Sequence, residues 1–143
     1  MPKIKILLGF DFGIRHIGVA IGQTLTNTAS PLLPSIKANK GLPDWRKVKK
    51  LILEWCPDKI IVGLPINMDG SEQLLTIHTR IFAKKLFHHF SIPVDLYDER
   101  LTTIEAKNKL FINRGYRGLK KNHIDSFAAV LILESFLLNL QSG

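Results

Sequence analysis

Acidic residues at three places in the chain stand in otherwise apolar surroundings, and their chemistry needs an explanation. Asp11 interrupts the apolar run KIKILLGFDFGIRHIGVAIG at residues 3–22. The pair Asp98-Glu99 follows a short apolar stretch, and Asp125 lies near the start of an almost wholly apolar segment. Burial of an unpaired carboxylate costs several kcal/mol, so each of these acids needs a partner.

A hard divalent cation is a partner that would hold all three acids together. Carboxylates that are brought close repel one another and raise one another's pKa unless a cation neutralises them. Mg²⁺ and Mn²⁺ prefer oxygen ligands, and Mg²⁺ keeps several waters, so a few carboxylates suffice. Two such ions about 4 Å apart can activate a water and stabilise the leaving oxygen of a phosphodiester. The acids therefore predict a site for one or two Mg²⁺ or Mn²⁺ ions that hydrolyses phosphodiester bonds.

Each acid also has a purely structural interpretation. Asp11 could accept backbone hydrogen bonds from a turn. Asp98 or Glu99 could pair with Arg100 or stabilise the N-terminus of a following helix through its dipole. Asp125 could belong to a variant capping box at the start of the last helix. The joint occurrence of the acids in the first strand, the last strand and the last helix favours the metal site.

Hydrophobic periodicity and turn residues predict the elements that would carry these acids. Strands are expected at 4–12, 17–23, 32–38, 58–65 and 94–100. Pro43 is expected to open a helix at its first position, and the last helix contains the apolar segment 124–140. Three leading strands, then strands alternating with helices, indicate an α/β fold: a mixed five-stranded sheet with helices on both faces.

The composition is typical of one globular domain spanning residues 1–143. Hydrophobic residues make up 45% of the chain and charged residues 22%. A single cysteine, Cys56, excludes an internal disulfide, and its place on the core face of a helix predicts a small buried hydrophobe. The N-terminus lacks a secretory pattern and no apolar segment reaches the length of a bilayer span, so we expect a cytoplasmic protein without a membrane partner.

The charge balance favours a polyanionic partner such as nucleic acid. The net charge is +8, which suits such a partner without identifying it. From residue 100 to residue 121 the chain has seven Lys or Arg against one acid. The candidate substrate contacts in this basic segment are Arg100, Arg114, Tyr116, Arg117, Lys120 and Lys121. The tyrosine could stack on a base or pack against the protein, and the basic residues could equally form a solvated face.

Two further positions are candidate substrate contacts. Arg15 follows the Asp11 strand on a turn, where its planar guanidinium could hold a phosphate through two hydrogen bonds. Asn67 belongs to the NMDGS loop at 67–71, after a strand expected near the middle of the sheet. This loop could contact substrate or could be an ordinary turn that begins a helix.

Four long motifs occur in order along nearly the whole chain. They are LGFDFGIRHIGVAIG at 8–22, IIVGLPINMDGSE at 60–72, VDLYDERLTTIEA at 94–106 and HIDSFAAVLIL at 123–133. Together they resemble the YqgF/RuvX family of small bacterial proteins, which is related to Holliday-junction resolvases of the RuvC type. The resemblance implies a ribonuclease-H-like fold with a βββαβαβα core. At Arg15-His16 the family often has Lys-Arg, so substrate contacts there are expected to differ.

The resemblance also implies an activity and a set of site residues. By position, Asp11, Glu99 and Asp125 match the acidic triad of a divalent-metal nuclease, with Glu99 chosen over Asp98. Family members are associated with maturation of the 5′ end of ribosomal RNA precursors. The implied function is an endonuclease acting on structured nucleic acid, with RNA favoured over DNA, precursor 16S ribosomal RNA as the substrate and ribosome precursors as partners.

Other functions stay open on the sequence alone. A Holliday junction resolvase acting on DNA would need two active sites, and the sequence does not set the oligomeric state. A non-catalytic RNA-binding module would bind in a salt-dependent way that loss of the acids leaves unchanged. An ATP-binding relative of actin shares the Asp-x-Gly turn at Asp11, but such proteins need two lobes and 143 residues supply one.

Overall fold

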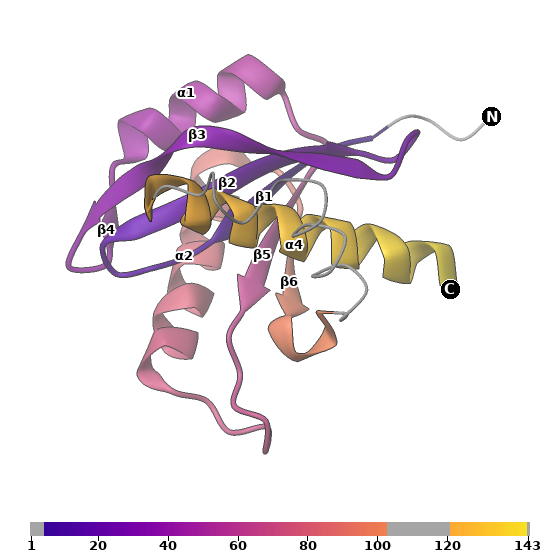
Figure 1. The fold of residues 1–143 in the computed structure, drawn as a ribbon. Coiled ribbons are helices and arrows are strands. Elements are labelled where there is room, and N and C mark those ends of the chain that lie inside the picture. The colour runs from indigo at the N-terminus through magenta and orange to yellow at the C-terminus, as the bar shows by residue number, and fades with distance from the viewer. Residues whose placement is uncertain (1–4, 103–120, 143) are drawn as a thin grey trace.

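The computed structural model describes residues 5–102 and 121–142, and in the last helix it describes the side chains of 126–140. The elements are β1 (Ile6–Asp11), β2 (His16–Gln23), β3 (Thr28–Asn39), β4 (Leu42–Pro43), α1 (Trp45–Trp55), β5 (Lys59–Leu64), α2 (Leu74–Phe90), β6 (Val94–Asp98), a 3₁₀ turn η1 (Glu99–Leu101) and α4 (Lys121–Ser142) (Figure 1). The helix expected just after residue 102 lies outside the described residues.

One mixed sheet organises the chain, with strand order β4-β3-β2-β1-β5-β6. β1, β2 and β3 pair antiparallel, and β5 pairs parallel with both β1 and β6. The predicted mixed α/β sheet is confirmed. Its sixth strand is the two-residue β4, which pairs with the end of β3. The parallel strands β1, β5 and β6 end at the same edge, where ligands of such sheets commonly bind.

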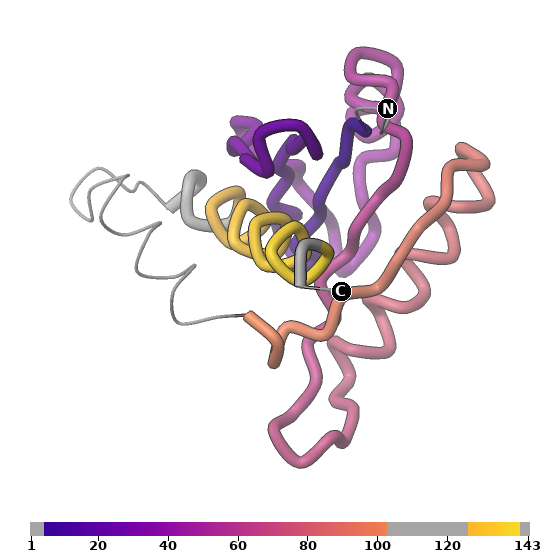
Figure 2. The backbone as a smooth tube through the Cα atoms, turned by 90° about the vertical axis from the view of Figure 1, so that its right-hand side faces the viewer, coloured from indigo at the N-terminus to yellow at the C-terminus, as the bar shows by residue number. Residues whose placement is uncertain are grey.

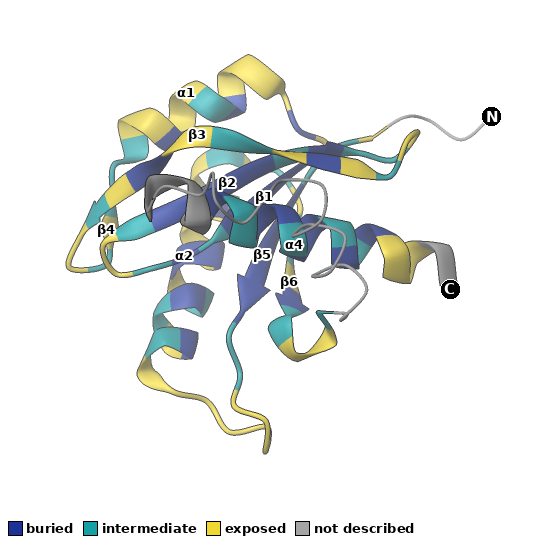
Figure 3. Cartoon of the chain, in the orientation of Figure 1, coloured by how far each residue is buried: buried dark blue, intermediate teal, exposed yellow. Residues whose placement is uncertain are grey.

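Helices cover both faces of the sheet, as the continuous apolar strands predicted. Figure 2 shows α1 and α2 on one side of the strands and α4 on the other. Leu8, Phe10 and Val62 pack in the core beneath α1 and α2. Leu7, Ala20 and Ile61 pack in the second core, beneath α4. Successive residues of a strand point to opposite faces, so β1 and β5 are buried on both sides (Figure 3).

The start of α1 differs from the prediction. Pro43 lies in β4, and the helix begins at Trp45 after Asp44, whose side chain accepts a hydrogen bond from the Arg46 backbone N–H. An aspartate N-cap satisfies a free backbone donor, which proline at the first helical position does not do. The third strand is also longer than predicted, because pairing with β2 begins at Thr28.

The interpretation of Cys56 as a buried hydrophobe is wrong. α1 ends at Trp55, and Cys56 follows as its C-cap with a left-handed backbone, φ 46°. This cap turns the chain off the helix, so the cysteine leaves the core face and is exposed. A residue just past a helix C-terminus commonly takes this conformation.

Close packing and buried hydrogen bonds fix α4 across the sheet. An added Cβ at Gly9 of β1 would lie 2.5 Å from the Leu133 Cγ atom, so only glycine admits the helix at this distance. The buried Ser126 hydroxyl donates to the Leu32 carbonyl at 2.9 Å and accepts from the Val19 N–H at 3.4 Å.

Among the described helices, none is both long and apolar enough to cross a membrane.

Candidate active site

Asp11 and Glu99 come together at the edge where β1, β5 and β6 end. Asp11 is the last residue of β1, and Glu99 begins η1 directly after β6. Phe10 and Phe12 pack beneath α1 and α2, so the intervening Asp11 points to the α4 face. The two side chains share a hydrogen bond there. A hydrogen bond between two carboxyls requires one of them to be protonated.

Burial decides the electrostatics of this carboxyl pair. It raises the pKa of Glu99 above its usual 4.5, because the surroundings penalise the charged form. The hydrogen bond from Asp11 acts in the opposite direction, and the negative charge of Asp98 raises the Glu99 pKa further. The Asp11 and Glu99 carboxyls therefore lie within hydrogen-bond reach of each other, in surroundings that disfavour two negative charges.

A glycine in β5 makes room for Glu99. An added Cβ at Gly63 would lie 2.8 Å from Glu99 Oε1 and 2.3 Å from Ile132 Cδ1. Both distances are too short for a real Cβ contact. The Glu99 carboxyl and Ile132 of α4 therefore pack directly against the backbone of Gly63. Its sequence signal was available, since glycine inside a strand often marks a close approach, but the interpretation of 58–65 as an ordinary buried strand missed it.

The turn η1 holds Glu99 through the residues on either side of it. Asp98 caps the turn by accepting from the Arg100 N–H at 2.9 Å. It also binds the Arg100 guanidinium, with Nη2 at 2.7 Å from Oδ2. The Tyr97 hydroxyl donates to the Leu101 carbonyl at 3.3 Å and accepts from Asn139 of α4.

This arrangement separates the roles of the two neighbouring acids. The Arg100 hydrogen bonds hold the pKa of Asp98 below its usual range, so Asp98 is a charged partner of arginine. Glu99 instead faces Asp11. The geometry therefore favours Glu99 as the acid for a cation, while Asp98 takes the ion-pairing role that was the structural alternative for this pair.

A divalent cation fits the observed donor set. Two carboxyl groups, one at the end of β1 and one at the start of η1, come together, and Gly63 leaves space beside Glu99. Oxygen ligands of this kind suit Mg²⁺ and Mn²⁺, and neutralisation by the cation would remove the repulsion between two charged carboxylates. Within the residues whose side chains are described, no group of three potential ligands is present. Asp125 belongs to α4, but its side chain lies outside that set.

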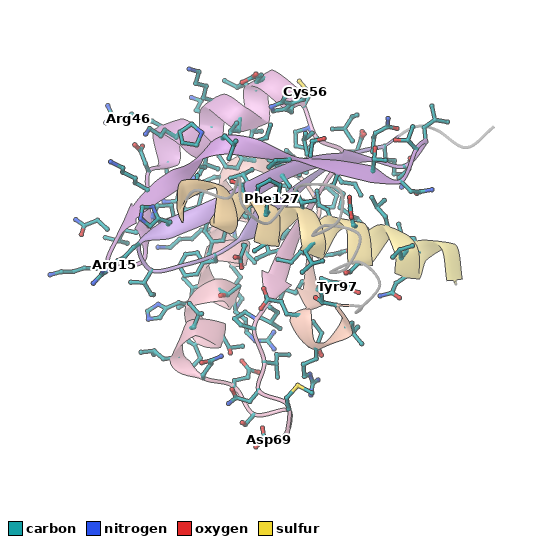
Figure 4. The ribbon with its side chains drawn as sticks, viewed as in Figure 1. Arg15, Arg46, Cys56, Asp69, Tyr97 and Phe127 are labelled. Carbon is teal, nitrogen blue, oxygen red and sulfur yellow. The ribbon has the colours of Figure 1, made fainter. Side chains whose placement is uncertain are left out.

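The candidate substrate contacts that can be traced lie around this edge of the sheet. Arg15 is exposed on the turn between β1 and β2 and points outward (Figure 4). Asn67 lies in the exposed loop after β5, where its side chain donates to Ser71 at 3.0 Å and Asp69 accepts from the same serine. Arg100 forms an ion pair with Asp98, and its guanidinium lies beside Gly70 of this loop.

The other predicted contacts belong to the segment before α4 and to the start of that helix. Arg114, Tyr116, Arg117 and Lys120 lie outside the described residues. Lys121 begins α4, but its side chain is outside the described set. Their roles stay predictions.

Comparisons with known proteins agree on one family. The profile of the RuvX family, described as Holliday junction resolvase, matches residues 5–139. Curated proteins from Escherichia coli O157:H7 and Salmonella arizonae carry the name "Putative pre-16S rRNA nuclease". Each is 56% identical over 130 residues, which cover 91% of this chain and 94% of the relative.

Solved structures agree on the fold. Thermus thermophilus RuvC in complex with a Holliday junction substrate matches with a TM-score of 0.64 at 17% identity, over 96% of both chains. The yeast mitochondrial Holliday junction resolvase Ydc2 matches with a TM-score of 0.56 at 13% identity, over 92% of this chain and 77% of that one. These likenesses confirm the ribonuclease-H-like fold that the motifs implied. The chain belongs to the RuvX family.

Proposed function

We propose that this protein is a divalent-metal-dependent endonuclease that hydrolyses phosphodiester bonds in structured nucleic acid. The observation that carries the proposal is the Asp11–Glu99 carboxyl pair, held at the edge where three parallel strands end. Two half-buried acids within hydrogen-bond reach of each other are costly to keep unless they serve a purpose such as metal binding. Family membership and the names of the relatives supply the reaction class.

The residues divide into those that hold metal and those that hold substrate. Asp11 and Glu99 would bind one or two Mg²⁺ or Mn²⁺ ions, with Asp125 as a third ligand from α4. When bound, such ions supply positive charge to the phosphate and activate the water that attacks phosphorus. Gly63 and the η1 turn keep Glu99 in position. Arg15 and the basic segment before α4 would bind the sugar–phosphate backbone.

The favoured substrate is precursor 16S ribosomal RNA, cleaved near its 5′ end. Relatives that are 56% identical over 91% of this chain are named for that RNA. Work on ribosome precursors would place the protein in the cytoplasm. The alternative is resolution of Holliday junctions in DNA, which the description of the family and the fold of RuvC favour.

A cleavage assay tests the proposal and separates its two substrates. Wild type and Asp11→Asn are each incubated with a precursor 16S 5′ fragment and with a four-way DNA junction, in Mg²⁺, in Mn²⁺ and in EDTA. Circular dichroism checks that the variant is folded. We expect metal-dependent cleavage of the RNA by wild type alone. Paired cuts in the junction with intact RNA would establish the resolvase instead.

Two results would contradict the metal site. A folded Asp11→Asn protein that cleaves at the wild-type rate would show that the carboxyl pair is not the active site. Tight, salt-dependent binding by both proteins, without cleavage in either metal, would indicate a non-catalytic binding module.

A further inference from the structure

Basic side chains gather at one end of the molecule, on segments other than the one before α4. Residues 37–50 contain six Lys or Arg against one acid, Asp44. Together with the turn between β1 and β2 they form a surface that we term the basic end. It consists of Arg15, Lys37, Lys40, Arg46, Lys47 and Lys50, all exposed. Figure 4 shows Arg15 and Arg46 projecting from the same end of the ribbon.

Backbone hydrogen bonds fix these segments against one another. The Ala38 N–H donates to the Arg15 carbonyl at 2.8 Å, and the Gly41 N–H donates to the Ile14 carbonyl at 3.0 Å. The Asp44 N–H, at the start of α1, donates to the Lys37 carbonyl at 3.3 Å. The turn, the end of β3 and the first turn of α1 therefore form one rigid basic surface.

The charge of the basic end is not neutralised within the described part of the protein. Elsewhere, Lys59, Arg80 and Arg100 each contact a carboxylate at 2.7–2.9 Å. The only ion pair within the basic end that the described residues include joins Arg46 to Asp44 at 4.0 Å, and the arginine side chain is 98% exposed. Unpaired exposed cations that are rigidly grouped repel one another, and a polyanion would relieve that repulsion.

The basic end reaches the face of the sheet that carries the carboxyl pair. Ile36 packs beneath α1 and α2, so the adjacent Lys37 points to the α4 face, as Asp11 does. Asp11 pairs with Gly18, and Lys37 pairs with His16 two residues farther along β2. Strand spacing and rise then put the Lys37 backbone about 12 Å from that of Asp11. Lys37 thus lies on the face of the candidate site, and backbone hydrogen bonds join its segment to the turn of Arg15 and to the start of α1.

We propose that the basic end binds the phosphate backbone of the nucleic acid that flanks the cleaved bond. The inference rests on the proposed function for its partner, and it adds α1 and the end of β3 to the substrate-binding surface. These lysines would contact phosphates without reading bases, so they would contribute affinity and salt dependence rather than sequence preference.

Binding measured without cleavage tests this surface. The double variant Lys47→Ala/Lys50→Ala removes two charges from α1, and Lys84→Ala/Lys85→Ala removes two exposed lysines from α2 as a matched control. Alanine favours the helix in both. Fluorescence anisotropy with a labelled RNA hairpin, in EDTA and over a range of salt concentrations, gives the slope of log K against log salt. Lys37→Ala is measured alongside.

In the α1 double variant, the slope of log K against log salt should become less steep by up to about 1.8, because each lost phosphate contact removes roughly 0.9 from the slope. Lys37→Ala should lose up to about 0.9, and the α2 control should keep the wild-type slope. An α1 variant and a Lys37→Ala protein that both keep the wild-type slope would overturn the inference, as would an equal loss in the α2 control. The binding assay in EDTA does not depend on cleavage, so a wild type that binds here but does not cleave in Mg²⁺ or Mn²⁺ would contradict the proposed nuclease while leaving this surface supported.

Discussion

Replacing Gly63 with alanine should damage the candidate site from a position that carries no chemistry of its own. The new Cβ would lie 2.3 Å from Ile132 Cδ1 and 2.8 Å from Glu99 Oε1. Ordinary contact begins near 3.4 Å, so the isoleucine methyl must retreat by about 1.1 Å and the carboxyl oxygen by about 0.6 Å. Movement of this size displaces Glu99 relative to Asp11.

The expected effect has a stability part and an activity part. Overpacking of this kind lowers the free energy of unfolding by about 1–3 kcal/mol. Metal-dependent cleavage should fall further than the loss of folded protein explains, because site geometry must be kept within roughly 0.5 Å. Urea unfolding measures the first part, and cleavage rates at a temperature where the variant is fully folded measure the second.

Gly9→Ala is the matched control for this prediction. Its Cβ would lie 2.5 Å from Leu133 Cγ, so it also strains the contact between the sheet and α4, but Glu99 is not among the atoms that it meets. We expect a similar loss of stability with near wild-type cleavage by the folded protein. Equal activity in the two folded variants would refute the reasoning that Gly63 positions Glu99.

Three further results follow from the same contacts. In metal-free protein the raised pKa of Glu99 means that folding favours its protonated form. This contribution to stability is complete below about pH 4.5 and is lost as the pH rises through the folded-state pKa. Urea unfolding in EDTA should therefore show Glu99→Gln gaining stability relative to wild type from acidic to neutral pH. Ser126→Ala should lower the free energy of unfolding by about 1–3 kcal/mol in thermal or urea melts, because it leaves the Leu32 carbonyl and the Val19 N–H without their buried partner. Asp98→Asn weakens the ion pair with Arg100, worth at most about 1 kcal/mol, and keeps a side-chain oxygen to cap η1. Its cleavage rate should therefore stay within about fivefold of wild type while Glu99→Gln loses cleavage; equal losses in the two would contradict the separate roles of these acids.

The sequence predicted the sheet well because its strands are buried on both faces. Continuous apolar runs such as residues 6–10 are typical of strands covered on both sides, and the motif order indicated the family directly. Boundaries were harder, since they depend on single residues. Proline at 43 looked like a helix start, but the Asp44 side chain caps the helix one residue later. Cys56 matched the helical period, yet the left-handed cap turned it outward.

The sequence indicates candidate acids for the site but not the packing around them. Isolated carboxylates in apolar runs are visible in a sequence, and Asp11 was singled out in this way, while Glu99 was chosen over Asp98 through the family resemblance. Whether Asp98 or Glu99 faces Asp11 depends on the η1 turn and on Arg100, which only a three-dimensional arrangement reveals. The space made by Gly63 depends on α4, which lies about 70 residues away in sequence and packs on the same strand.

The most direct test of the central claim is the affinity for Mn²⁺ measured by electron paramagnetic resonance on four proteins. They are wild type, Asp11→Asn, Glu99→Gln and, as the control, Asp98→Asn. If Asp11 and Glu99 hold the ion, both of their variants should bind at least about tenfold more weakly, the equivalent of 1.4 kcal/mol. The Asp98→Asn protein should keep the wild-type affinity. Equal affinities in all four proteins would contradict the assignment of this carboxyl pair as the metal site.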